Sequence, residues 1–120
     1  MTRINCVPVR ELSGKHLVAE YRELPRVYAL AQRAFNRGEE PVQHPKHYTL
    51  GTGHVRFFYS RVGYVINRHK QLITEMERRG YRPLFRIPVV PNLPAEWLRS
   101  WRPTPEALHI NRIRIMERTK

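Results

Sequence analysis

An amphipathic stripe near the start of the chain is the feature that most limits its fold. Between residues 11 and 37, apolar side chains recur at spacings of 4, 3, 4, 3 and 4. They are Leu17, Tyr21, Leu24, Tyr28, Ala31 and Phe35. This spacing is typical of one face of an α-helix, with Ser13 as N-cap and a stop at residues 36–38. Pro25 lies inside the pattern, so we expect one missing hydrogen bond and a kink there.

Two further helices are expected. The second carries an apolar stripe at Val62, Val65, Ile66, His69, Leu72, Ile73 and Met76. It ends in two arginines and then Gly80, as a helix C-terminus prefers. Thr104 and Pro105 supply an N-cap and first turn for a third helix over about residues 104–118.

The connections between these helices are long. Residues 39–54 have no periodicity and read as a loop, and residues 81–103 hold five of the ten prolines. We expect the second connection to be an ordered, extended wrap that packs Leu93, Trp97 and Trp101 on the helices. The prediction is an all-α, compact three-helix single domain spanning residues 1–120, with long proline-rich connections.

Charge narrows the class of partner. Twenty-two Lys and Arg against ten acidic residues give a net charge of +12, and Arg outnumbers Lys by 18 to 4. This balance favours a polyanion such as DNA, because the planar guanidinium suits phosphate. The absence of Asp disfavours an Asp-rich metal site, and the single Cys6 excludes an internal disulfide framework. Without an apolar run or a signal peptide, a cytoplasmic, nucleoid-associated protein is expected.

Arginines on the first helix are the candidate DNA contacts. Arg22, Arg26 and Arg33 fall on one face, where they can meet successive phosphates. Arg3 near the N-terminus and Arg114 and Arg118 on the third helix add to this basic surface. The alternative is an ordinary solvated charged face.

An acidic residue interrupts that basic face. Glu23 stands between Arg22 and Arg26, where it repels phosphate. Glu20 is three residues earlier on the same helix. An intrahelical ion pair between Glu23 and Arg26 or Arg22 is one explanation, and a catalytic role is the other.

No metal or cofactor is expected. His44, His47 and His54 have no spacing typical of a zinc site, so surface or hydrogen-bonding roles are expected. His69 falls on an apolar stripe and reads as a core residue. The main nucleophile to consider is the α-amine of Thr2, exposed if Met1 is removed. Its reference pKa of about 7.7 to 8.0 leaves part of it neutral at pH 7, but many chains begin in this way.

Several segments together resemble a known family. They are Thr2-Arg3-Ile4-Asn5, residues 19–27 (AEYRELPRV), Gly53-His54-Val55 and Phe57-Phe58-Tyr59, with Leu17, Arg79 and Gly80 in register. The similarity is to the phage endonuclease V type of pyrimidine-dimer DNA glycosylase/AP lyase, and it covers about residues 1–80. It implies a compact three-helix fold with the N-terminal segment between helices, and an enzyme that kinks duplex DNA and flips out a base opposite the lesion.

The resemblance also implies roles for individual residues. The α-amine of Thr2 would attack C1′ and form a Schiff base, and Glu23 would stabilise the sugar cation and assist β-elimination. Arg3, Arg22 and Arg26 would grip phosphates, and His16 would lie at the DNA interface. The expected partner is double-stranded DNA containing UV photoproducts or abasic sites. We expect the protein to bind it as a monomer, and no membrane association is expected. The competing interpretation is a non-catalytic basic DNA-binding or architectural domain.

Overall fold

The computed structural model describes residues 3–84 and 91–119, and within these ranges the chain is helical without a β-strand. The α-helices are α1 (Gly14–Glu23), α2 (Arg26–Asn36), α3 (His54–Phe57), α4 (Val62–Arg78) and α5 (Pro105–Thr119). Single 3-10 turns lie at η1 (Val9–Glu11), η2 (Pro41–Gln43) and η3 (Ala95–Trp97). No described helix has the length and hydropathy needed to cross a bilayer. The all-α prediction is confirmed, and the three long helical regions appear where the apolar periodicity and, for α5, the capping residues predicted them.

Pro25 divides the first helical region into α1 and α2. Its own dihedrals remain helical, with φ −59° and ψ −18°. Leu24 still donates its N–H to the Glu20 carbonyl, at 2.8 Å, whereas Val27 and Tyr28 donate to carbonyls only three residues back, at 3.0 and 3.2 Å. Such i to i−3 bonds tighten a turn. The expected break at Pro25 is therefore confirmed, and it leaves Glu23 as the last residue of α1.

Capping residues fix the ends of the helices at the predicted positions. Ser13 and Thr104 each accept, through the side-chain oxygen, a backbone N–H from three residues further on, at 3.2 and 3.1 Å. At the other ends, Gly38 and Gly80 adopt φ of 88° and 87° after α2 and α4. Glycine adopts this left-handed conformation without the cost that a Cβ would impose.

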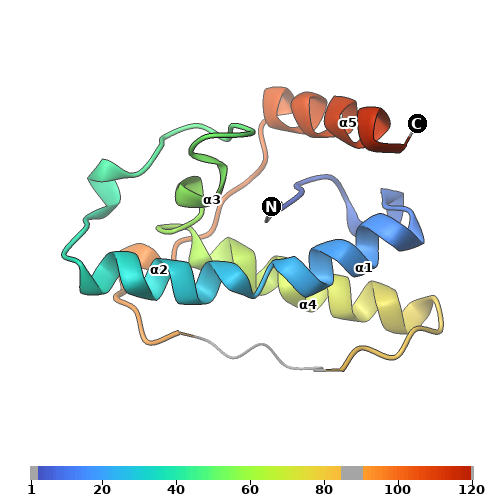
Figure 1. Cartoon of the computed structure of the whole chain (residues 1–120), viewed down its shortest axis with the longest axis horizontal. Helices are drawn as coiled ribbons and strands as arrows, with labels where there is room; N and C mark the ends of the chain where they lie inside the picture. Colours follow the sequence, from blue (N-terminus) through green and yellow to red (C-terminus); the bar gives the residue numbers. More distant parts are fainter. Residues whose placement is uncertain (1–2, 85–90, 120) are drawn as a thin grey trace.

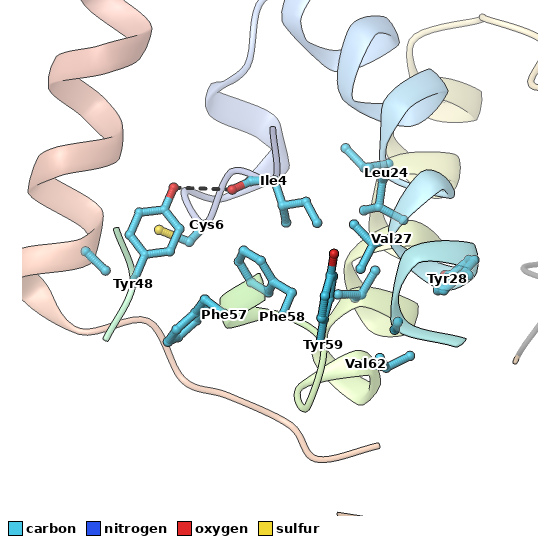
Figure 2. Packing of buried hydrophobic residues seen from close by; sticks show 14 of the residues in the cluster. Ile4, Cys6, Leu24, Val27, Tyr28, Tyr48, Phe57, Phe58, Tyr59 and Val62 are labelled. Carbon is cyan, nitrogen blue, oxygen red and sulfur yellow. Dashed lines mark hydrogen bonds between the residues drawn. The ribbon is translucent and has the colours of Figure 1, made fainter. Parts of the chain in front are cut away.

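The N-terminal segment is part of the core. α1 and α2 pack on α4, and the segment runs between these helices and α5 (Figure 1). Ile4 is fully buried and belongs to the hydrophobic core cluster, where Figure 2 shows it together with Phe58, Leu24 and Val27. The Tyr48 hydroxyl donates to the Ile4 carbonyl at 3.2 Å. The start of the described chain is therefore fixed from several sides.

The aromatic residues of the proline-rich connection also belong to the core. Leu93 and Trp97 are buried, and Trp97 meets the ring of His44 edge-on. Trp101 is half-buried and stacks on Tyr48, with 5.6 Å between ring centroids and 12° between planes. The predicted packing of this connection is confirmed for its described parts, residues 81–84 and 91–103.

Candidate active site

A pocket of about 340 Å³ opens between α1, α5 and the N-terminal segment. Its lining comprises Arg3, Asn5, Lys15, His16, Ala19, Glu20, Glu23, Ile115 and Arg118. Three parts of the chain that are distant in sequence thus meet at one cavity. Four of the predicted site residues line this pocket: Arg3, His16, Glu23 and Arg118.

Glu23 is the acidic residue at this pocket whose carboxylate has no hydrogen bond or ion pair to a described residue. It is half-buried at the end of α1. Among the described residues, no hydrogen bond or ion pair engages its carboxylate, so the ion pair with Arg22 or Arg26 considered above is not found. The carboxylate remains available to a ligand in the pocket.

Arg3 brings a positive charge to the same cavity. Burial lowers the pKa of its guanidinium, and the nearby charges of Arg118 and Arg114 lower it further, while Tyr48 and Glu23 act in the opposite direction. Its Nη1 atom is buried and has no hydrogen-bond partner among the described residues. A buried donor without an acceptor is costly, so this group favours an anionic ligand.

His16 and Arg118 of α5 also line the pocket, whereas Arg114 of α5 lies outside its lining. The His16 Nδ1 atom is buried and also lacks a hydrogen-bond partner within the described ranges. Arg118 lines the cavity directly. Arg114 acts on Arg3 through its charge and lies 3.7 Å from the carboxylate of Glu117. The pocket that contains Glu23 is therefore also lined by hydrogen-bond donors and cations.

The remaining predicted DNA contacts lie outside the pocket. Arg22, Arg26 and Arg33 are exposed along α1 and α2. No ion pair to a described residue occupies any of their guanidinium groups. They form a free basic surface that continues from the end of α1 where Glu23 stands.

The predicted nucleophile, Thr2, lies outside the described residues, as does Met1. Arg3 is the next residue in the chain and lines the pocket with Glu23.

A buried ion pair beneath the pocket was not predicted. Glu20 and Arg68 have side chains only 1% and 2% exposed, and Arg68 Nε lies 2.8 Å from Glu20 Oε2. Burial disfavours the charged guanidinium, but the Glu20 carboxylate outweighs this and holds the pKa of Arg68 above its ordinary value. A sequence signal existed: Glu20 lies three residues after Leu17 on the apolar side of α1. A charged residue at such a position requires a buried partner.

His54 supports the N-terminal segment from another side. Its Nε2 accepts the backbone N–H of Ile4 at 2.9 Å, and its Nδ1 donates to the Thr49 carbonyl at 2.8 Å. Burial lowers the pKa of His54, the Thr49 carbonyl raises it, and the charges of Arg3 and Arg114 lower it. The neutral ring with its proton on Nδ1 fits both hydrogen bonds.

Two further histidines, His44 and His69, also have structural partners. His44 is buried and hydrogen-bonded to Ser60 and Glu39, both at 3.2 Å. His69 bonds the hydroxyl of Tyr28 at 3.1 Å, which confirms its prediction as a core residue. Among residues 3–84 and 91–118, no cluster of three His, Cys or Glu side chains could hold a metal ion.

Fold and pocket together define a class: a basic all-α protein with a cation-lined cavity, in which one carboxylate has no hydrogen bond or ion pair within the described part of the chain. The family model for pyrimidine dimer DNA glycosylase matches residues 1–86, and the chain belongs to this family. Membership supports a function in DNA repair as a pyrimidine dimer DNA glycosylase, with DNA that contains such dimers as substrate. The match includes α1 to α4 and ends before α5.

Proposed function

We propose that the protein is a bifunctional DNA glycosylase/AP lyase that uses the α-amine of Thr2, after removal of Met1, as its nucleophile. The amine attacks C1′ of the damaged nucleotide and the C1′–N bond to the base breaks. Loss of the ring oxygen from C1′ then leaves a Schiff base between Thr2 and the open sugar. Proton abstraction at C2′ and departure of the 3′ phosphate complete the β-elimination.

An α-amine is suited to this step. Its reference pKa of about 7.7 to 8.0 is more than two units below that of lysine, so more of it is neutral near pH 7. Neighbouring positive charges favour the neutral form further. Arg3 and Arg118, both at the pocket, supply such charges.

Glu23 is the proposed partner of the amine. A carboxylate among arginines weakens binding of phosphate, but it stabilises the cationic sugar that develops as the base departs. This is stronger binding of the transition state than of the ground state. The same carboxylate can then accept the proton from C2′. The observation that carries the proposal is this unpaired carboxylate in a pocket also lined by Arg3, the residue next to Thr2.

The cationic side chains are proposed to hold the DNA. Arg3, Arg114, Arg118 and the side chain of His16 would contact the phosphates nearest the lesion. Arg22, Arg26 and Arg33 would follow the strand along α1 and α2. A duplex kinked over this surface can release a base from the stack, which a glycosylase needs in order to reach C1′.

The test is a borohydride trap on a duplex carrying one cyclobutane pyrimidine dimer and on one carrying an abasic site. Reduction of the Schiff base should give a covalent protein–DNA complex with both, and unreduced reactions should give the unsaturated 3′ end of β-elimination. The matched control is the chain extended by two glycines before Thr2, which keeps every side chain but moves the amine. It should form no adduct. An adduct of equal yield from the extended chain, or none from either protein, would contradict the proposal.

A further inference from the structure

A buried polar network holds the segment that leads to the amino terminus. Asn5 donates its backbone N–H to Glu20 Oε2 at 3.3 Å and its side-chain Nδ2 to Glu20 Oε1 at 2.8 Å. Arg68 from α4 binds the same carboxylate through Nε and Nη2, at 2.8 and 3.0 Å, and its Nη1 donates to the Val7 carbonyl. One carboxylate thus joins the N-terminal segment, α1 and α4.

Asn111 on α5 closes the network from the opposite side. Its Oδ1 accepts the backbone N–H groups of Cys6 and Val7, at 2.7 and 3.1 Å. Its Nδ2 donates to the Asn5 side-chain oxygen at 2.8 Å. Asn111 is fully buried, and it lies beyond residues 1–86 that the family model matches. The C-terminal helix of this chain therefore takes part in holding its first residues.

A buried hydrogen-bond network of this kind fixes the direction of a backbone segment better than apolar packing does. Buried charges are no more stabilising than well-packed apolar groups of the same volume, but a fully satisfied network admits few alternative arrangements. Here, both oxygens of Glu20 and both polar atoms of Asn111 have partners. The backbone of residues 5–7 is thereby held on both sides.

The segment that the network holds, residues 5–7, is close in sequence to the proposed nucleophile. Thr2 is three residues before Asn5 in the sequence, and Arg3, the residue after Thr2, lines the pocket with Glu23. Glu20, one helical turn before Glu23, fixes Asn5 relative to the catalytic carboxylate. Ile4 is bound from the other side by His54. The hydrogen bonds to Ile4 and Asn5 therefore set the direction of the backbone at these two residues.

We propose that Asn5, Glu20, Arg68 and Asn111 are positioning residues that aim the amino terminus at C1′ of the damaged nucleotide. This inference rests on the proposed function, in which the α-amine of Thr2 is the nucleophile. A misplacement of about 1 Å in such a reaction can cost a hundredfold in rate. Loss of one link should therefore slow formation of the Schiff base much more than it weakens DNA binding.

The experiment measures these two quantities separately in Asn111→Ala. The rate of Schiff-base formation comes from single-turnover borohydride trapping on an abasic-site duplex, with Met1 removal checked by mass spectrometry. Binding is measured with a duplex that carries a tetrahydrofuran abasic analogue, which has no C1′ leaving group. We expect the trapping rate to fall at least tenfold while Kd changes less than threefold.

Two further variants separate positioning from stability. Tyr28→Phe is the matched control, because it also removes a buried hydrogen bond, that to His69, but this bond joins α2 to α4 and does not involve the N-terminal segment. It should trap at the wild-type rate although its Tm also falls. Asn5→Ala keeps the bonds of Asn111 to Cys6 and Val7 and gives the answer if Asn111→Ala is unfolded at the assay temperature. It should likewise trap at least tenfold more slowly.

The outcomes distinguish this inference from the function on which it rests. If wild type gives no trapped complex, the proposed function fails. If wild type traps DNA but folded Asn111→Ala and Asn5→Ala trap within twofold of its rate, the positioning role is overturned and the nucleophile stands. A rate lowered equally in Tyr28→Phe would also overturn it, because general destabilisation would then explain the loss.

Discussion

Glu20 and Glu23 are three residues apart on α1 and have opposite surroundings. The Glu20 side chain is 1% exposed, and its carboxylate receives bonds from Arg68 and Asn5. The Glu23 carboxylate is half-buried at a pocket and has no partner among the described residues. Both sit in a chain with strong positive charge, so charge balance alone does not explain either one.

The different surroundings of the two glutamates indicate different roles: a structural one for Glu20 and, in the proposed mechanism, a chemical one for Glu23. A buried carboxylate is tolerated only when its hydrogen bonds and its charge are satisfied, as those of Glu20 are. A carboxylate without a hydrogen bond or ion pair among the described residues adds little to the fold, and among arginines it weakens phosphate binding. In the proposed mechanism it acts on a positive charge that develops only during the reaction. Glu23 should therefore control rate, and Glu20 should control the shape of the site.

The largest expected effect is that of Glu23→Gln on activity. Removing the charge that stabilises the sugar cation should lower single-turnover base excision by about a thousandfold, or about 4 kcal/mol. The free energy of unfolding should stay within about 0.5 kcal/mol of wild type, because no partner is lost. Affinity for undamaged duplex should be equal or higher. A variant that excises dimers at the normal rate would remove the distinction between the two glutamates.

Glu20→Gln should act in the opposite manner. It leaves Arg68 as an uncompensated buried charge, so urea denaturation should show a loss of about 3 kcal/mol in the free energy of unfolding. Adding Arg68→Met to the same chain removes the stranded charge and should recover most of that loss. If Glu20→Gln costs less than about 1 kcal/mol, the ion pair is not the closed structural unit described here.

Arginines on the free basic surface should have a smaller, salt-dependent effect. If about five to seven phosphates are neutralised, log K should fall with log salt at a slope of about −5 to −6. Arg26→Ala should reduce that slope by about one and weaken binding of dimer-containing and undamaged duplex alike, by about tenfold at low salt. Arg112→Ala is the matched control, since Arg112 is already paired with Glu11 at 3.0 Å. An unchanged slope for Arg26→Ala would remove this residue from the DNA contacts.

The smallest expected effect is a pH dependence through His54. Its pKa in the folded protein lies below the ordinary 6.5, mainly because of burial. The unfolded chain therefore binds the proton more readily, and stability should fall as pH drops below about 6.5, by at most about 1.4 kcal/mol per pH unit. His54→Gln, which can keep both hydrogen bonds, should lose less stability between pH 7.5 and pH 5.5. An equal loss in both proteins would assign the dependence to other groups.

Much of the fold could be predicted from the sequence because its signals are local. The apolar spacing, the caps at Ser13 and Thr104, and the break at Pro25 each involve residues within one or two turns. The contacts of Asn111 with Cys6 and Val7 join residues more than 100 positions apart, and no local pattern encodes them. Their discovery required the fold.

The candidate site divides in the same way. Glu23 attracted attention because an acid among arginines conflicts with phosphate binding, and the pocket contains it together with Arg3, His16 and Arg118. The position of Glu20 on the apolar side of α1 indicates that its side chain is buried, but it does not identify the partner of its carboxylate. Its partner Arg68 follows Val65 by three residues on α4, so it too occupies an apolar side. Pairing the two required knowing that α1 packs on α4.

The most direct measurement of the central claim is the identity of the atom that holds the DNA. The borohydride-reduced complex formed on a dimer-containing duplex should be digested with protease and nuclease and sequenced by tandem mass spectrometry. The account predicts a deoxyribose remnant on the α-amine of Thr2 and on no lysine side chain. A remnant on Lys15, which also lines the pocket, or on any other side chain would contradict it.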